Sequence, residues 1–340
     1  MRITLLSLFF FLPCYYFIYI TFQIPVASAK CLDDQQSLLL QLKNNLTFKL
    51  ENSNKLKLWN SSIDCCDWIG VDCDNNGFVI GLDLSGELIS GGFDNRSSLF
   101  SLQSLQKLNL ASNYFNSVIP SGFNKLVMLS YLNLSYANFV GQIPVEISQL
   151  TRLVTLDLSS PSSYFLGQGL KLENPNLQSL VRNLTSIRQL YLDGVIINAQ
   201  GREWSNVLLP LRGLEELTMS NCNLTGPLDS SLSRLENLSI IILDGNNFSS
   251  PVPETFFNFR NLTTISLESC GLTGTFPQKI FQIGTLSFID LSFNYNLHGS
   301  FPEFPTTGSL QTLRVSNTSF SGAFPYSIGN MRHLSEFVIC

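Results

Sequence analysis

The sequence is poor in charge and in histidine, and this argues against two broad classes of function. Lys, Arg, Asp and Glu make up 13% of the 340 residues, well below the usual ~25%. The net charge is −5, so the chain lacks the basic surface of a nucleic-acid-binding protein. The two histidines, His298 and His333, lie near no nucleophile motif, metal-ligand spacing or phosphate-binding loop. We therefore expect no enzyme, no metal site and no cofactor.

One long apolar run is present, and no second one follows it. Residues 1–29 begin with Arg2 and an apolar stretch and end in Ala27-Ser28-Ala29, the layout of a secretory signal peptide cut after Ala29. An uncleaved membrane anchor is the alternative, because the run approaches the ~20 residues of a membrane span. Without Arg2, residues 30–340 carry 19 of the 20 Lys and Arg against 25 Asp and Glu, a net charge of −6.

Ten Asn-x-Ser/Thr sequons fit a secreted glycoprotein, whose sugars would keep a weakly charged surface soluble. An Asn- and Ser-rich chain also yields sequons by chance, so some of them can remain unmodified. The acceptor residues are Asn45, Asn60, Asn95, Asn133, Asn183, Asn223, Asn237, Asn247, Asn261 and Asn317.

A repeat of nearly constant length dominates residues 79–340. The unit begins LxxLxL and often continues to G-x-(I/F)-P, as in LSYLNLSYANFVGQIP and LTTISLESCGLTGTFP. Its first apolar residue, the anchor, falls at Val79, Leu105, Leu129, Leu153, Ile187, Leu214, Leu238, Leu262, Leu286, Leu310 and Leu334. Seven of the ten spacings are 24 residues and the others are 26, 34 and 27, a register that chance does not maintain. We predict about ten complete repeats and a truncated eleventh, with an irregular repeat over 159–186 whose extra residues form a loop or helix.

The spacing within each unit predicts a short strand. The last two apolar residues of LxxLxL are two positions apart, so both point to the same side of a strand. Successive strands would stack ~4.8 Å apart in a parallel ladder, and no unit can bury its apolar face alone. The sequence therefore predicts a solenoid with one continuous core.

Residues 30–78 do not repeat and are predicted to form an N-terminal module. Asp33 is expected to cap a helix whose apolar face includes Leu39 and Leu42. Trp59 and Trp68 are expected in the core of the module. Its cysteines are Cys31, Cys65, Cys66 and Cys73. They allow three pairings, of which the one that joins the two adjacent cysteines is disfavoured by strain.

These motifs resemble the plant-type extracellular leucine-rich repeat, LxxLxxLxLxxNxLxGxIPxxLxx. The stretches CLDDQQSLLLQLK, CCDWIGVDCD, LVTLDLSS, KLENPNLQSLVRNLT and LYLDGV are similar to the Verticillium wilt disease-resistance receptor-like proteins of plants. The resemblance covers residues 30–340. It implies an α/β solenoid, a right-handed superhelix with a parallel sheet on its concave face and a disulfide-bonded N-terminal cap. It also implies the pairs Cys31–Cys65 and Cys66–Cys73.

In that family an Asn eight residues after the anchor ties neighbouring turns together. This position, the Asn slot, holds Asn113, Asn246 and Asn294. Smaller polar substitutes occupy it at Cys222, Cys270 and Thr318, and unsuitable residues at Ala137, Pro161 and Val195. Cys222 and Cys270 lie two repeats or ~10 Å apart, beyond the ~7 Å that a disulfide spans, and are expected to be buried free thiols. Cys340 is left over.

Residues two and four positions after each anchor, and those just beyond, form the predicted concave face. A mixed apolar and acidic band on it is expected to bind a peptide or protein of basic character. The predicted ligand-binding residues are Tyr191, Asp193, Glu216, Ile240, Ile242, Asp244, Glu268, Phe288, Asp290 and Arg314. The alternative is that solvated acids and scattered apolar residues need no partner. A glycan on Asn133 would block the first repeats and push a ligand toward later ones.

The resemblance implies the ligand-recognition ectodomain of a cell-surface immune receptor-like protein, which has no kinase and signals through leucine-rich-repeat receptor kinases. Such proteins continue into more repeats, a cap, a membrane helix and a short tail. We therefore expect an N-terminal fragment or truncated member, located at the extracellular face of the plasma membrane if anchored and secreted otherwise. The alternatives are a secreted inhibitor of a pathogen cell-wall-degrading enzyme, resembling the polygalacturonase-inhibiting proteins, and a non-functional truncated copy.

Overall fold

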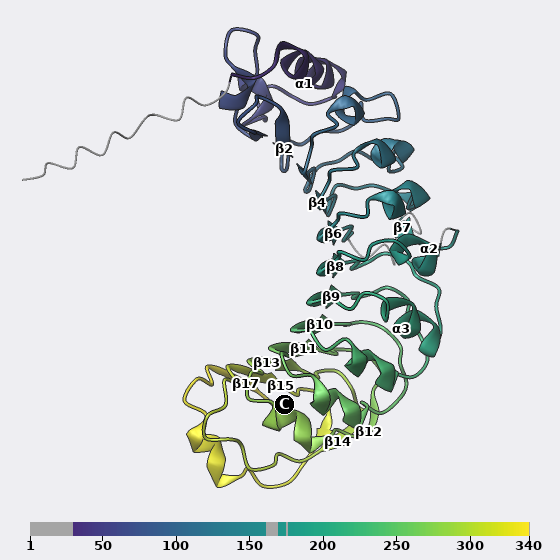
Figure 1. Ribbon diagram of the computed structural model, residues 1–340. Helices are drawn as coiled ribbons and strands as arrows, with labels where there is room; N and C mark the ends of the chain where they lie inside the picture. Colours follow the sequence, from purple (N-terminus) through teal and green to yellow (C-terminus); the bar gives the residue numbers. More distant parts are fainter. Residues whose placement is uncertain (1–29, 161–168, 175, 340) are drawn as a thin grey trace, which may run out of the picture.

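The structure is a computed structural model that describes residues 30–160, 169–174 and 176–339. The described chain forms an arc whose strands line the inner side and whose short helices lie on the outer side (Figure 1). This confirms the predicted leucine-rich-repeat solenoid. The signal peptide, Pro161 and Cys340 lie outside the described residues.

The concave face is a 12-stranded sheet whose strand order follows the chain. β1 pairs antiparallel with β2, and each later strand pairs parallel with the one before it. The strands are β1 Val71–Cys73, β2 Val79–Asp83, β3 Lys107–Asn109, β4 Tyr131–Asn133, β6 Thr155–Asp157, β8 Gln189–Tyr191, β9 Glu216–Thr218, β10 Ile240–Ile242, β11 Thr264–Ser266, β13 Phe288–Asp290, β15 Thr312–Arg314 and β17 Glu336–Val338.

The central residue of the three-residue strands from β3 to β15 is buried, as the LxxLxL spacing predicts. In β10 the central Ile241 is 1% exposed, whereas Ile240 and Ile242 on either side are half-buried on the concave face. The anchors Leu238 and Leu262 are fully buried. Equivalent residues of successive repeats pack against one another in a single hydrophobic core that continues into the N-terminal module.

The outer side of the solenoid consists of short helices and two small sheets. A proline stands immediately before several of the 3₁₀ helices, where its fixed φ suits the turn into the helix. Pro144, Pro277 and Pro325 among them end a G-x-(I/F)-P segment. The 3₁₀ helices of the repeats are η3 Ser98–Ser101, η4 Ser121–Lys125, η5 Val145–Gln149, η7 Ser230–Arg234, η8 Glu254–Asn258, η9 Gln278–Gln282 and η10 Tyr326–Asn330. Among the described residues, the α-helices there are α2 Leu177–Val181 and α3 Arg202–Leu208. The small sheets comprise β12 Thr273–Thr275, β14 Asn296–Gly299 and β16 Ser319–Phe320, and β5 Gly141–Gln142 and β7 Leu170–Lys171.

The N-terminal module begins with α1 Asp33–Asn45, and the expected capping role of Asp33 is wrong. Leu32 is the N-cap residue and no side chain caps this helix. The amide of Leu32 donates to the carbonyl of Gly77 at 3.1 Å, so the chain before the helix is held by the loop ahead of β2. Asp33 therefore lies in the first turn, where its charge favours the helix dipole without closing a cap.

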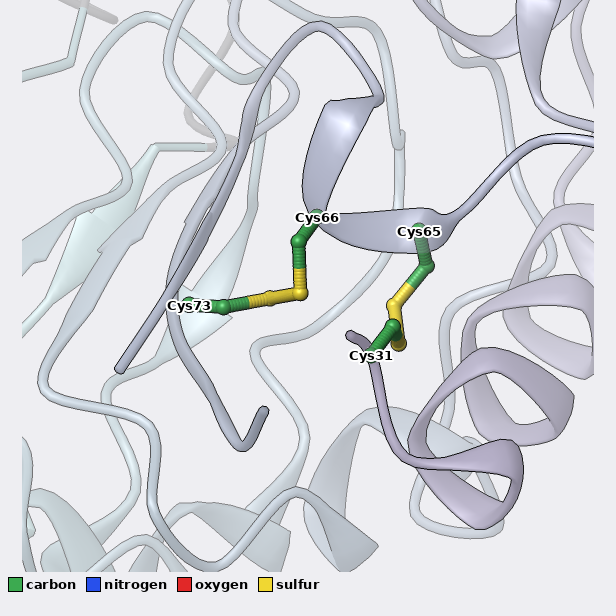
Figure 2. A group of neighbouring side chains, drawn as sticks. All are labelled: Cys31, Cys65, Cys66 and Cys73. Atoms are coloured by element: carbon green, nitrogen blue, oxygen red, sulfur yellow. A yellow bond between two sulfur atoms is a disulfide. The ribbon is translucent and has the colours of Figure 1, made fainter. Parts of the chain in front are cut away.

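Two disulfides (Figure 2) hold the rest of this module together with a pair of stacked tryptophans. Cys31 is bonded to Cys65 and Cys66 to Cys73, the pairing that the family resemblance implies. Trp59 and Trp68 are 1% and 4% exposed, and their ring centroids lie 5.0 Å apart. Both rings are core residues, as predicted. The remaining turns are η1 Leu56–Leu58 and η2 Cys65–Asp67.

The predicted Asn slot ties successive repeats together through both ends of the amide. Asn246 Oδ1 accepts the backbone N–H groups of Cys222 and Leu224 at 3.1 and 3.0 Å, while its Nδ2 donates to the carbonyl of Met219 at 2.8 Å. Asn294 and Asn113 make the same kind of bonds one repeat back. Cys222 and Cys270 are buried free thiols whose Sγ atoms donate to backbone carbonyls of the preceding repeat. A thiol thus replaces the donor of the amide but not its acceptor.

In the first repeat the same slot is occupied by Glu87, which sequence reasoning missed. Its carboxylate is 1% exposed and accepts the backbone N–H groups of Asn54, Lys55 and Leu56 at 3.1–3.2 Å, together with the hydroxyl of Ser53. The sequence contained a signal for this role, because Glu87 stands eight residues after the anchor Val79, at the offset of the Asn slot. Glu87 therefore extends the ladder of slot residues into the N-terminal module.

Replacing this carboxylate tests its structural role. In Glu87→Gln one oxygen becomes an NH₂ group that faces backbone N–H donors, so we expect a loss of about 1–3 kcal/mol in the free energy of unfolding, measured by urea denaturation. Glu254→Gln, at an exposed glutamate in η8, is the matched control and should be near neutral. Equal unfolding midpoints for the two variants would contradict the role of Glu87.

Candidate functional site

Two rows of side chains cross the concave sheet, one from the first residue of each strand and one from the last. The first row contains Gln189, Glu216, Ile240, Thr264, Phe288 and Thr312 in register. The second row contains Tyr191, Thr218, Ile242, Ser266, Asp290 and Arg314. Seven of the predicted ligand-binding residues therefore lie in these rows. The other three, Asp193, Asp244 and Glu268, lie two residues beyond the ends of β8, β10 and β11.

Two isoleucines of β10, Ile240 and Ile242, lie at the centre of these rows, and we call this pair the aliphatic step. β10 presents Ile240 and Ile242 half-buried on the concave face, and Glu216 of β9 is the direct partner of Ile240. Phe288 lies two strands further along the same row, beyond Thr264. Half-exposed apolar side chains next to carboxylates form a surface suited to a ligand with both apolar and basic groups.

Upstream of this step, hydrogen bonds fix the polar side chains to one another. Glu216 accepts from the hydroxyl of Tyr191 and, at 2.9 Å, from Nε2 of Gln189. Gln189 in turn accepts from Thr155 Oγ1 at 2.6 Å. Burial and the Glu216 carboxylate raise the pKa of Tyr191 far above its ordinary value of 10.0, so Tyr191 is a permanent donor here. The network holds the Glu216 carboxylate at the edge of the aliphatic step.

Two of the predicted acidic residues also hold the loops of their own solenoid. Asp193 accepts the N–H of Ser220 at 2.6 Å and the hydroxyl of Thr218 at 2.7 Å, both from the next repeat. Asp244 likewise accepts the N–H of Glu268 at 2.8 Å. These carboxylates contribute negative charge to the face, but part of their hydrogen-bonding capacity is already used.

The field of the neighbouring acids acts on Asp244 and Glu268. Burial and, to a smaller extent, the charges of Glu268 and Asp290 raise the pKa of Asp244 to about 6, against hydrogen bonds from Ser266 and Glu268 that lower it. Burial, then the charge of Asp290, also raises the pKa of Glu268. Among the described residues, neither Asp244 nor Glu268 belongs to an ion pair.

Arg314 closes the band at its far end. Its guanidinium donates to both carboxylate oxygens of Glu336 at 3.0 Å, lies 3.4 Å from Asp290 and sits 5.4 Å from the centre of the Phe288 ring. Asp290 is only 4% exposed and also accepts the N–H of Ser292. Asp290 therefore contributes charge rather than contact surface, and Arg314 is already paired.

The other predicted groups lie away from these rows. His298 in β14 and His333 before β17 are both exposed. The four sulfur atoms of the N-terminal module lie within 4.8 Å of one another, a spacing that could suit a metal ion, but all four are engaged in the two disulfides. Nine of the ten sequon asparagines are exposed, and Asn133, at the end of β4, is half-buried. Within the described residues, no helix combines the length and apolar character required to cross a membrane.

The family comparison matches both parts of the fold. Residues 32–74 match the leucine rich repeat N-terminal domain, and residues 103–161, 213–235 and 309–331 match leucine rich repeats. The chain is a leucine-rich-repeat protein with an N-terminal cap of that type.

Its relatives are plant receptor-like proteins, which confirms the resemblance drawn from the motifs. The chain is 35% identical to Receptor-like protein 6 and 38% identical to Receptor-like protein 7 of Arabidopsis thaliana. The matches cover 90% and 95% of this chain but only 27% and 28% of those relatives. Receptor-like protein Cf-9 of Solanum pimpinellifolium is 31% identical over 64% of this chain and 26% of its own length. This chain therefore spans about a quarter of the length of these relatives.

Solved structures share the solenoid. The Arabidopsis receptor kinase HAESA, in complex with the peptide hormone IDA and the co-receptor SERK1, superimposes with a TM-score of 0.74 at 26% identity. That match covers 91% of this chain and 53% of the HAESA chain. A plant ice-binding protein superimposes with a TM-score of 0.71 at 22% identity, over 92% of this chain and 96% of its own, which shows a common fold only.

The raised pKa of Asp244 predicts how stability depends on pH. Because the folded state holds this proton more tightly than the unfolded state, the group lowers stability as pH rises from about 4 to about 6. Asp244→Asn removes the charge, so at pH 7 the variant should exceed the wild type by about 1–3 kcal/mol in free energy of unfolding. The difference should vanish near pH 4, measured by urea denaturation across pH.

Asp229→Asn is the control, because the pKa of Asp229 is shifted in the opposite direction and its removal should change stability in the opposite direction. Hydrogen bonds from Ser231 and the charge of Arg202 lower the pKa of Asp229, so its ionised form stabilises the fold and is lost as pH falls through the lowered pKa. This variant should be less stable than the wild type at pH 7. If Asp244→Asn were also less stable at pH 7, the assignment for Asp244 would be wrong.

Proposed function

We propose that this chain is the ligand-recognition region of a plant cell-surface receptor-like protein, and that it binds a peptide or protein segment with apolar and basic side chains. The observation that carries the proposal is the aliphatic step of Ile240 and Ile242 between carboxylates that have no cationic partner among the described residues. The apolar surface supplies affinity, and the unpaired carboxylates favour a ligand that carries positive charge.

The ligand would cross the strands between β8 and β15. Its apolar side chains would cover Ile240, Ile242 and the exposed part of Phe288, and its Lys or Arg side chains would face Glu216, Asp244 and Glu268. Asp193, Asp290 and Arg314 would shape the electrostatic field from positions that are already hydrogen-bonded. Tyr191 would orient Glu216.

The relatives support a wider role for the complete protein. HAESA is a receptor kinase whose structure contains a peptide hormone and a co-receptor, and this chain is similar to receptor-like proteins. We infer that the complete protein lies at the extracellular face of the plasma membrane and recognises an extracellular ligand, with pathogen-derived molecules among the candidates. It would signal through leucine-rich-repeat receptor kinases in plant immunity. Recognition in this scheme is non-catalytic.

Binding to a designed set of peptides tests the proposed surface. The secreted glycoprotein is titrated with three synthetic dodecapeptides. In the first, leucines alternate with lysines; in the second, leucines alternate with glutamates; in the third, serines alternate with lysines. We expect the leucine–lysine peptide to bind at least about tenfold more tightly than the other two by isothermal titration calorimetry, because both kinds of contact are then made.

Two charge reversals separate this face from the rest of the surface. Glu268→Lys changes a half-buried concave residue whose side chain has no hydrogen bond or ion pair with the described residues. This variant should bind the leucine–lysine peptide at least about tenfold more weakly. Glu254→Lys makes the same charge change on the outer helix η8 and should leave the affinity unchanged. Equal binding of the glutamate peptide, or equal effects of the two variants, would refute the proposal.

A further inference from the structure

A hollow of about 320 Å³ lies at the N-terminal end of the concave face, well before the proposed ligand surface. It is lined by Asp72, Leu82, Asp83, Lys107, Asn109 and Tyr131, which come from β1, β2, β3 and β4. Its volume is at the lower limit of the ~300–1,000 Å³ of sites that hold small molecules. It therefore has room for a ligand of one or two rings.

The hollow exists because β2 has a glycine, Gly81, where a side chain would otherwise stand between Asp72 and Lys107. Gly81 is the partner of Asp72 on one side and of Lys107 on the other. A Cβ at Gly81 would come within 2.6 Å of the Asp72 carboxylate, so a larger residue would have to displace the Asp72 side chain. The glycine thus leaves a gap in the row, bounded by side chains that can donate and accept hydrogen bonds.

The adjacent strand end carries a sequon asparagine, and its orientation is fixed. Asn133 pairs with Asn109 in register. Its Oδ1 accepts the backbone N–H of Ser135 at 2.9 Å and the Ser135 hydroxyl at 2.7 Å. A backbone N–H can only donate, so the other end of the amide must be Nδ2, and this atom lies 3.3 Å from the hydroxyl of Tyr131. The nitrogen that accepts a sugar is therefore next to a residue that lines the hollow.

We propose that Asn133 carries a glycan whose first N-acetylglucosamine seats in this hollow. The sugar is transferred from a lipid-diphosphate-linked oligosaccharide in the secretory pathway: a bond forms between Nδ2 and the anomeric carbon, the amide loses a proton, and the lipid diphosphate leaves. The transfer takes place on the emerging chain, so the burial of Ser135 in the folded protein does not oppose it. Folding then closes the strand beside the attached sugar.

The lining suits this occupant chemically. N-acetylglucosamine is uncharged, with an apolar C–H face that can lie on the ring of Tyr131 and with hydroxyl and acetamide groups that both donate and accept. Asn109 Oδ1 already accepts the N–H of Ala111 at 3.1 Å, which leaves its NH₂ group for the sugar. Lys107 is exposed and can donate, and Asp72 can accept. The glycan would cover β2–β4 and leave the face from β8 onward open.

The test uses the other sequons of the same molecule as internal controls. The glycoprotein is secreted from mammalian cells and digested under native conditions with peptide-N-glycosidase F, and release at each site is followed by peptide mass spectrometry. We expect Asn133 to be occupied and to lose its glycan at least about tenfold more slowly than the exposed Asn237 and Asn261, because the enzyme must wait for a local opening. After denaturation all three sites should react alike.

Two tyrosine variants separate a seated sugar from general steric hindrance. Tyr131→Ser leaves the sequon intact and should accelerate native release at Asn133 several-fold, without changing the rates at Asn237 and Asn261. Tyr114→Ser, at a 55% exposed tyrosine between β3 and η4, should leave release at Asn133 unchanged. An unoccupied Asn133, release as fast as at Asn237, or no effect of Tyr131→Ser while the other sites keep their rates would each overturn the proposal.

Discussion

Hydrogen bonds between successive repeats, rather than within them, hold this structure together. After each concave strand the backbone donates to the next repeat, as Leu84 does to Asn109, Leu110 to Asn133 and Leu243 to Ser266. One repeat alone would leave these groups unsatisfied, so its stability depends on its neighbours. The slot residues add side-chain bonds in the same direction. Each Asn serves backbone amides of the repeat before it, as Asn246 does for Cys222 and Leu224.

Hydrogen bonds between successive units also involve the N-terminal module and the acidic band of the concave face, which sequence reasoning treated separately. Glu87 satisfies the backbone of the N-terminal module from the first slot, so the module is joined to the solenoid by the contact that joins one repeat to the next. On the concave face Asp193 and Asp244 also accept amides from a following repeat. Part of the acidic band is therefore structural, and the surface left for a ligand centres on Ile240, Ile242 and Glu268.

The repeat register predicted the sheet and the core because each depends only on distance along the chain, and the family pattern placed the Asn slots in that register. Asn113, Asn246 and Asn294 could be assigned a role from the family pattern before any coordinates. Other roles depend on where a loop turns, which spacing does not determine. Asp33 failed as a cap because the bond from Leu32 to Gly77 fixes the chain one residue earlier. Asp290 fits the acidic pattern, yet the loop after β13 buries it.

The low charge content of the chain makes the remaining unpaired carboxylates more important. Within the described residues, Lys171 and Arg202 pair with acids outside the concave rows. Arg314 pairs with Asp290 and Glu336 at the far end of the band. Neighbouring strands of the sheet are ~4.8 Å apart, which is less than the ~8 Å Debye length at physiological ionic strength. Carboxylates on successive strands therefore act on an approaching ligand together, and a curved face concentrates their field on its inner side. A few carboxylates in register are therefore sufficient to give this face a negative electrostatic potential.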